Sequence, residues 1–441
     1  MLALDERDVV RRVDDLLERF GHRHRDLAAS FSHHADRIEN RLPADADLSE
    51  ARWLFLGATF THEYAIEATA LCNPSIGPLP DQSSAAAGTL QFAMSVRGIG
   101  EGHHSSIGFR TGVIAADGAV QLEPPGPFSA IGTVEPAMFN RGLFLDRLRA
   151  LGKASESASY VLGNLAPRFS AEELELQLAV LAEQRDTRRN AHATAALLRS
   201  LADRSYAVHF HPHSLLSERV LSPAMAEESH GMEDARFVRF VDDDGDATYY
   251  ASYTAYDGVS TAQQLLHTSD FETFTVSPLL GPAAANKGLA LFPRTVQGRY
   301  AALSRYDRET NAVAFSKTLG HWGDAVTCQL PDRDWEVIHL GNCGSPIEAK
   351  DGWLVLTHGV GPMRTYSIGP SSSTSTTPPR CSPRSTSHCS PPTPMNRTAT
   401  CRTSCTPVEG SSTGTRWWCR TGSPTARSAS PRSPGPTYGT R

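Results

Sequence analysis

Four stretches of this sequence share one pattern, and that pattern limits the fold more than any other feature. Each has a turn residue, then a short apolar or aromatic run, then small or polar residues: GTLQFAMSVRG from Gly88, DATYYASYTAYDG from Asp246, GRYAALSRYD from Gly298 and GWLVLTHGV from Gly352. Such runs are typical of β-strands. The last three start 52 and 54 residues apart. A period of about 50 residues, with several short strands per unit, predicts the blades of a β-propeller.

Two parts of the chain show helical periodicity instead. Between residues 4 and 40, apolar residues such as Val9 and Val13 recur at helical spacing among charged neighbours. A second block covers about 170–203 and begins with Ser170 and Glu173, the pair of residues that forms a capping box at a helix start. The apolar face of this second helix is expected to consist of Leu174, Leu178 and Leu181.

These patterns predict the domain organisation. We expect an N-terminal helical segment over residues 1–50 and an all-β propeller domain over residues 51–369, interrupted by a helical insertion at about 168–204. Residues 370–441 form a tail of different composition, rich in Ser, Pro, Arg and Cys.

The bulk properties exclude several classes of partner. A net charge of -6 gives no reason to expect nucleic acid or an anionic membrane surface as a partner. The sequence has no run of 18 apolar residues that would predict a membrane span. The first residues, MLALDERDVVRRVDD, lack the apolar centre of a signal peptide, and only three cysteines precede residue 370. We therefore expect a cytoplasmic protein, and the sequence leaves open whether it forms a homo-oligomer.

Two segments carry the strongest candidate chemistry. In SVRGIGEGHHSSIGFRTG, glycines allow a tight turn that would expose Arg97, Glu101, His103 and His104 between two strands. In ESHGMEDARF, Asp234 and Arg236 would lie on the same side of an extended segment, beside Glu233. A polar surface loop and a structural salt bridge are the alternatives to a functional site in these two segments.

Other polar residues are weaker candidates when taken alone. Lys287 and Arg305 bracket a predicted strand pair, and Glu348 and His358 occur in GNCGSPIEAKDGWLVLTHGV. The stretch HFHPH places its alternating histidines on one face of a predicted strand, where they could ligate zinc. No carboxylate or cysteine follows at ligand spacing, so we expect no metal site; the histidines concerned are His209, His211 and His213.

Taken in order, these motifs resemble glycoside hydrolase family 130. The resemblance covers about residues 50–369 and rests on the series NPSI, SVRGIGEGH, MEDARF, TYYASYTAYDG, NKGLALFP, GNCGSPIE and GWLVLTHGV. The family contains β-mannoside phosphorylases and β-mannosidases built on a five-bladed β-propeller. The resemblance therefore implies the same fold and a β-mannoside oligosaccharide as the partner, with no cofactor.

The resemblance also implies roles for individual residues. Asp234 occupies the place of the family's catalytic aspartate, although Ala235 replaces the usual proline. That aspartate is thought to protonate the leaving oxygen through a sugar hydroxyl. Glu101 is the candidate base, with Glu348 and Glu233 as rivals. The predicted substrate-binding residues are Asn73, Arg97, His103, Glu233, Arg236, Asp257, Lys287, Arg305 and His358.

Hydrolysis and phosphorolysis differ in their need for cations. Phosphate is held by cations, preferably arginine, and the family's phosphorylases place arginines in two stretches that correspond to Val259–Gly281 here. Those stretches contain no Arg or Lys. This departure predicts an inverting, β-1,2-mannosidase-like hydrolase, in which an activated water replaces phosphate. The alternatives are a β-mannoside phosphorylase that releases mannose 1-phosphate and a non-catalytic, carbohydrate-binding propeller.

The tail from Pro370 contains no Leu, Ile, Phe, Asp or Lys. Read in another frame with GC-rich codons, residues 397–404 become DGYVPNV, and the segment that begins at Trp417 becomes VVPYG. Both resemble the last blade of the family, in family order. We therefore interpret the tail as a frameshifted fifth blade, and we expect the chain as written to be inactive.

Overall fold

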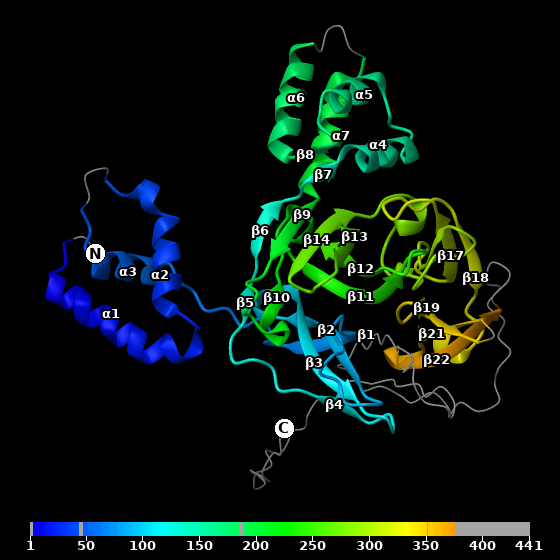
Figure 1. The fold of residues 1–441 in the computed structure, drawn as a ribbon, viewed down its shortest axis with the longest axis horizontal. Helices are drawn as coiled ribbons and strands as arrows, with labels where there is room; N and C mark the ends of the chain where they lie inside the picture. Colours follow the sequence, from blue (N-terminus) through cyan, green and yellow to red (C-terminus); the bar gives the residue numbers. More distant parts are fainter. Residues whose placement is uncertain (1–2, 44–46, 185–188, 351, 375–441) are drawn as a thin grey trace, which may run out of the picture.

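The described part of the chain is mostly β-sheet with two groups of helices (Figure 1). The computed structural model describes residues 3–43, 47–184, 189–350 and 352–374. The predicted tail lies almost wholly outside these residues, so its interpretation as a frameshifted blade stays a prediction. One strand nevertheless crosses the composition boundary, because β22 runs from Tyr366 to Thr374 and pairs with β21 along its whole length.

The strands form four antiparallel units that follow one another along the chain. The first unit contains β1 (Ala70–Pro78), β2 (Leu90–Ile99), β3 (Ser105–Ile114) and β4 (Val120–Leu122). The second contains β11 (Gly231–Val241), β12 (Ala247–Tyr256), β13 (Thr261–Thr268) and β14 (Thr273–Pro278). The third contains β15 (Ala290–Leu291), β16 (Tyr300–Ser304), β17 (Asn311–Ser316) and β18 (Ala325–Gln329). The fourth contains β19 (His339–Asn342), β20 (Ile347–Ala349), β21 (Gly352–Val360) and β22.

All four predicted strand segments are confirmed, as β2, β12, β16 and β21. Each is an inner strand with partners on both edges, which explains its continuous apolar character. The first two units join into one larger sheet because Gly231 of β11 pairs with Ser105 of β3. That sheet also includes β5 (Ala130–Ile131), β6 (Thr133–Pro136), β9 (Tyr206–His209) and β10 (Arg219–Leu221). The described residues thus supply four units, and a five-bladed propeller stays a prediction.

The N-terminal helices lie to one side of the sheets (Figure 1). They are α1 (Glu6–Phe20), α2 (Leu27–Asp36) and α3 (Glu50–Thr59). The first two confirm the helical periodicity, whereas α3 extends beyond the predicted boundary at residue 50. An ion pair ties this group to the rest of the protein, since Arg25 Nη2 donates to Glu218 Oε2 at 2.6 Å.

The helical insertion is longer than the sequence predicted. Figure 1 shows it beyond β9, with α4 (Arg141–Ala150), α5 (Glu156–Gly163), α6 (Ala171–Glu183) and α7 (Ala191–Asp203). The capping box at the start of α6 is confirmed, because Glu173 N donates to Ser170 Oγ and Ser170 N donates to Glu173 Oε2. The insertion begins before residue 168 because Phe144 of α4 packs against Phe169 in the same core as α6. A short pair, β7 (Phe139–Asn140) and β8 (Arg168–Phe169), closes its base.

Short 3-10 helices connect the remaining elements. They are η1 (Gly21–Arg23), η2 (Glu39–Arg41), η3 (Glu101–His103), η4 (Leu216–Glu218), η5 (Ala226–Glu228), η6 (Pro282–Ala284), η7 (Asp334–Glu336) and η8 (Pro362–Arg364). No helix among the described residues is both long enough and apolar enough to cross a membrane.

A buried carboxyl group lies at the end of η5. Glu228 is 0% exposed. Its oxygens accept hydrogen bonds from the hydroxyl of Tyr206 at 3.0 Å, from the hydroxyl of Tyr253 and from Ala224 N at 2.9 Å. Burial raises the pKa of Glu228 above its ordinary value, although these hydrogen bonds act in the opposite direction. Folding therefore favours the protonated form of Glu228.

We expect Glu228→Gln to remove a pH-dependent destabilisation. Because the pKa of Glu228 is higher in the folded state than in the unfolded state, the wild-type protein loses stability as pH rises through that interval. The glutamine variant should gain stability relative to the wild type as pH rises from about 4 to about 8. Urea unfolding of both proteins across this range measures the difference. A difference that does not change with pH would contradict the assignment.

Candidate functional site

Two β-bulges face each other where the first two sheet units meet. The β1–β2 register shifts between Cys72 and Ser75, and the β11–β12 register shifts between Glu233 and Arg236. Asn73 and Asp234 lie in these bulges with positive φ values of 51° and 58°, and the side-chain amide of Asn73 donates to Asp234 Oδ1. A left-handed residue other than glycine costs on the order of 1–3 kcal/mol and often marks a functional site. The paired bulges are therefore the starting point for the candidate site.

Arg97 of β2 binds both adjacent carboxylates. Its Nη2 donates to Glu233 Oε1 at 2.8 Å, and its Nη1 donates to Asp234 Oδ1 at 3.3 Å. Strict strand alternation would place Glu233 and Asp234 on opposite faces, and the bulge brings both to one cation. Burial alone would lower the pKa of Arg97, but the charges of Asp234 and Glu233 outweigh this effect and raise it. Arg97 therefore stays positively charged.

Further cations reach this point from the second and third units. Lys287 Nζ forms an ion pair with Glu233 Oε2. Arg236 Nη1 donates to the carbonyl of Gly288 at 2.9 Å and to Asn342 Oδ1. Asn342 Nδ2 in turn donates to the same carbonyl at 2.8 Å. These bonds tie β11, the segment before β15 and β19 together.

Gly341 is the point where Arg305 and His358 meet. A Cβ atom placed on Gly341 would lie 2.7 Å from Arg305 Cδ and 2.7 Å from His358 Cε1, so only glycine fits. A Cβ atom on Gly288 would lie 3.5 Å from Arg305 Cβ and 3.6 Å from Arg236 Nη1, which places the two arginines side by side. The fourth unit thus completes the site.

We call the resulting group the polar cluster. It contains eight of the twelve predicted site residues together with Asn342, and all four strand units contribute to it. Its members are Asn73, Arg97, Glu233, Asp234, Arg236, Lys287, Arg305, Asn342 and His358. Asn342 was not among the predicted residues, and its only signal in the sequence is its place beside glycines in the segment GNCG.

The other four predicted residues lie elsewhere. Glu101 and His103 are exposed in η3, at the tip of the β2–β3 hairpin, and Glu101 Oε1 accepts a hydrogen bond from Ala65 N at 3.2 Å. Asp257 caps the turn after β12 by accepting from Val259 N at 2.8 Å and from Ser260 N. These hydrogen bonds lower the pKa of Asp257.

The position of Glu348 argues against its predicted role as a base. Glu348 pairs with Trp353 in the β20–β21 ladder, whereas Gly341 pairs with His358. Five residues of strand separate these two positions along β21, or about 17 Å. The carboxylate instead forms an ion pair with Arg294 on the surface. Glu348 is close to GNCG in the sequence but not in space, because an extended strand separates the two positions.

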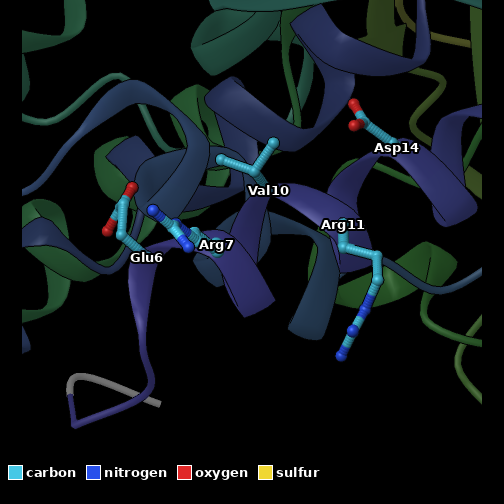
Figure 2. A pocket seen from close by; sticks show the side chains of 5 residues that line it. All are labelled: Glu6, Arg7, Val10, Arg11 and Asp14. Atoms are coloured by element: carbon cyan, nitrogen blue, oxygen red, sulfur yellow. The ribbon is translucent and has the colours of Figure 1, made fainter.

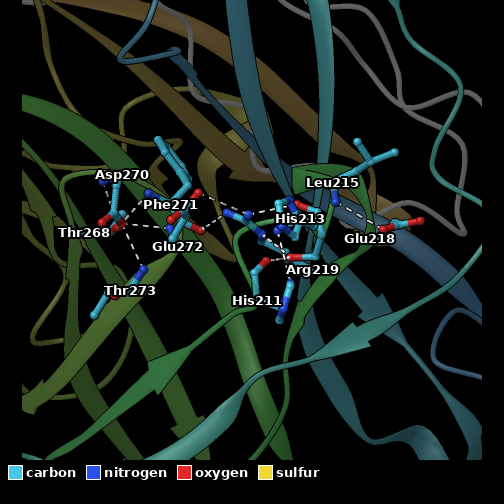
Figure 3. Close-up of polar contacts among 11 residues, drawn as sticks. His211, His213, Leu215, Glu218, Arg219, Thr268, Asp270, Phe271, Glu272 and Thr273 are labelled. Carbon is cyan, nitrogen blue, oxygen red and sulfur yellow. Dashed lines mark hydrogen bonds and ion pairs between the residues drawn. The ribbon is translucent and has the colours of Figure 1, made fainter. Parts of the chain in front are cut away.

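The alternating histidines do not share a strand face. β9 ends at His209, so His211 and His213 lie in the following turn, with ring centres 5.2 Å apart (Figure 3). The guanidinium of Arg219 holds this turn by donating to the carbonyls of Ser214 at 2.8 Å and Phe271 at 2.7 Å. Within the described ranges, no group of three or more His, Cys, Asp or Glu side chains is arranged to hold a metal ion.

A surface pocket on α1 belongs to a different part of the molecule. It is lined only by α1 residues, namely Glu6, Arg7, Val10, Arg11 and Asp14 (Figure 2). Since α1 lies to one side of the sheets in Figure 1, this pocket takes no part in the polar cluster.

Comparison with known proteins places these residues in a family context. The model of glycoside hydrolase family 130, described as β-1,4-mannooligosaccharide phosphorylase, matches residues 190–370. A 1,2-β-oligomannan phosphorylase from Thermoanaerobacter sp. (strain X514) is 30% identical over 161 residues, which cover 34% of this chain and 50% of the relative. A β-1,2-mannobiose phosphorylase from Listeria innocua is 29% identical over 154 residues, which cover 33% of this chain and 42% of the relative. The matches thus span half or less of these relatives.

Solved structures show a weaker likeness. The β-1,2-mannobiose phosphorylase from Listeria innocua has a TM-score of 0.37 and 18% identity, over 70% of this chain and 73% of that chain. A glycosyl hydrolase from Bacteroides ovatus has a TM-score of 0.38 and 15% identity, over 71% of this chain and 69% of that chain. The likeness to the family is carried by the sequence matches. Over residues 190–370, the chain is similar to glycoside hydrolase family 130.

Proposed function

We propose that the polar cluster catalyses the phosphorolysis of β-mannosides. The observation that carries this proposal is the balance of charge in the cluster. The cluster contains four cationic side chains and two carboxylates, which leaves an excess of two positive charges; the cations are Arg97, Arg236, Lys287 and Arg305, and the carboxylates are Glu233 and Asp234. A phosphate dianion would match that excess, and arginine is well suited to bind it. The names of the two curated relatives support the same reaction.

In this reaction the cations bind phosphate and a carboxylate supplies the proton. A phosphate oxygen would attack C1 of the mannosyl unit from the face opposite the leaving group, so that the C1–O bond to the acceptor sugar breaks as the C1–O bond to phosphate forms. The products are mannose 1-phosphate and a free acceptor hydroxyl. Asp234 is the candidate donor of the proton that the leaving oxygen takes up, either directly or through a sugar hydroxyl. Arg97 orients Asp234 and Glu233 through the hydrogen bonds described above.

The hydrolase predicted from the sequence is the second candidate. It is favoured by the lack of Arg and Lys in Val259–Gly281. That argument weakens because the cations of the polar cluster come from other segments, namely β2, β11 and the residues that flank β15 and β16. A non-catalytic carbohydrate-binding protein would explain the cluster less well, since a neutral sugar does not need four cations.

We also propose that the β-sheet units form a five-bladed propeller. The four antiparallel units and the convergence of their side chains support it, and the fifth blade would come from residues beyond β22. We propose that the tail carries this blade out of frame. Sequencing the gene around codon 369 tests this point, and an uninterrupted frame would contradict it.

We expect cleavage of β-1,2-mannobiose to require phosphate and to yield mannose 1-phosphate. The assay compares reactions with and without phosphate, both for the chain as written and for a version whose frame is restored after codon 369. Lys287→Met should raise the KM for phosphate by about tenfold, or about 1.4 kcal/mol of binding, because it removes one cation of the cluster. Lys153→Met, at an exposed position in the helical insertion, is the matched control. Release of free mannose at equal rates without phosphate would instead establish the hydrolase.

A further inference from the structure

Three neighbouring rings connect to the polar cluster through Lys287. The rings of His104 and His230 stack with centres 5.4 Å apart and planes at 17°, and His230 meets the ring of Tyr256 nearly edge-on at 6.0 Å. Lys287 Nζ lies 5.9 Å from the centre of the Tyr256 ring and pairs with Glu233. We call His104, His230 and Tyr256 the ring ledge. Through Lys287, the ring ledge connects the exposed imidazoles to the buried carboxylate of Glu233.

Two glycines leave room for the imidazoles of the ring ledge. Gly258 has a φ of 96°, and a Cβ atom there would lie 2.8 Å from His230 Cε1. Gly102 has a φ of 64°, and a Cβ atom there would lie 3.2 Å from His104 Cδ2. The hydroxyl of Tyr256 donates to the carbonyl of Gly258 at 2.7 Å, which fixes the third ring to the same turn.

We propose that the ring ledge binds the sugar units on the acceptor side of the bond that is cleaved. This inference rests on the proposed function. Glu233 and Asp234 are only 6% and 5% exposed, so the reacting mannosyl unit would lie deep in the cluster. The rest of the oligosaccharide must then leave past exposed groups, and the ring ledge borders Lys287 on that side. His104 and His230 are both exposed.

The chemistry of the ring ledge suits an oligosaccharide. One face of a pyranose presents C–H groups that pack on flat rings, while imidazole nitrogens and a phenol can exchange hydrogen bonds with sugar hydroxyls. The ledge would therefore distinguish oligosaccharides from single sugars. Of the two adjacent histidines that the sequence predicts to be exposed in this loop, His104 joins the stack, whereas His103 was the predicted ligand.

The test measures sugar binding by calorimetry, without phosphate, in the full chain with its frame restored after codon 369 and carrying Asp234→Asn, which slows turnover. The probes are β-1,2-mannotriose and methyl β-mannoside. We expect His230→Ala to weaken mannotriose binding by about tenfold, or about 1.4 kcal/mol, and to leave methyl β-mannoside binding unchanged. His230→Phe should retain most of the mannotriose affinity because it keeps a flat ring. His213→Ala, which alters the other exposed histidine pair, is the matched control.

Several outcomes would overturn the proposal. These are an equal loss of affinity for both sugars, unchanged mannotriose binding in His230→Ala, or failure of His230→Phe to restore affinity while circular dichroism shows an intact fold. If the protein catalyses neither reaction but mannotriose binding still depends on His230, the ring ledge is upheld and the proposed function fails. If no variant binds either sugar, both are wrong.

Discussion

Replacing Asp234 by asparagine is expected to lower turnover by about 10²–10⁴-fold while sugar binding persists. The amide keeps an oxygen that can accept from Asn73 and Arg97, but it cannot supply a proton to the leaving oxygen. Folding should be preserved because asparagine tolerates the positive φ of 58° at this position better than most residues do. Initial rates of mannose 1-phosphate formation, in the version whose frame is restored after codon 369, measure the effect.

A matched control for this substitution lies at the end of the same strand. Asp244→Asn alters an exposed aspartate in the β11–β12 turn and should leave turnover unchanged. If Asp234→Asn retains the activity of the parent protein, Asp234 does not deliver the proton. Glu233, the neighbouring carboxylate held by the same arginine, would then be the next candidate.

Phe109→Ala is expected to destabilise the folded protein by about 3–5 kcal/mol. Phe109 is 0% exposed, and its ring lies 5.5–6.0 Å from the rings of Phe237, Phe271 and Phe274. The substitution removes these contacts and leaves a cavity that the surrounding strands cannot fill. Denaturant unfolding measures the loss of free energy.

Phe60→Ala serves as the comparison for the core substitution. Its side chain is 53% exposed after α3, so the same chemical change should cost less than about 1 kcal/mol. Similar losses for the two variants would show that the aromatic core does not dominate the stability of the β-sheet units.

Local sequence predicted the strands well because each is an inner strand. A strand with partners on both edges buries both faces, and its apolar run is visible in the sequence alone, as in β12 and β21. The start of the helical insertion was predicted less accurately. Phe144 of α4 acquires its role only by packing against Phe169, a contact that local periodicity does not reveal.

The candidate site was predictable in part for a similar reason. A glycine-rich turn pointed to Arg97, the spacing of carboxylates and arginine pointed to Asp234, and a predicted strand pair pointed to Arg305, without any knowledge of their distances. The same reasoning misjudged Glu348, because a strand carries it about 17 Å from His358. Phosphate-binding cations were expected in one segment of the sequence, whereas the fold brings cations together from several segments.

The sequence by itself determined which segments form strands and which residue types are available for chemistry, because apolar runs and isolated charges are local properties. Only the tertiary structure decided which charges meet. The bulges at Asn73 and Asp234 turn neighbouring side chains toward one cation, and the missing Cβ of Gly341 lets Arg305 approach His358. Both effects depend on backbone conformation and on contacts between distant strands, which residue spacing does not encode.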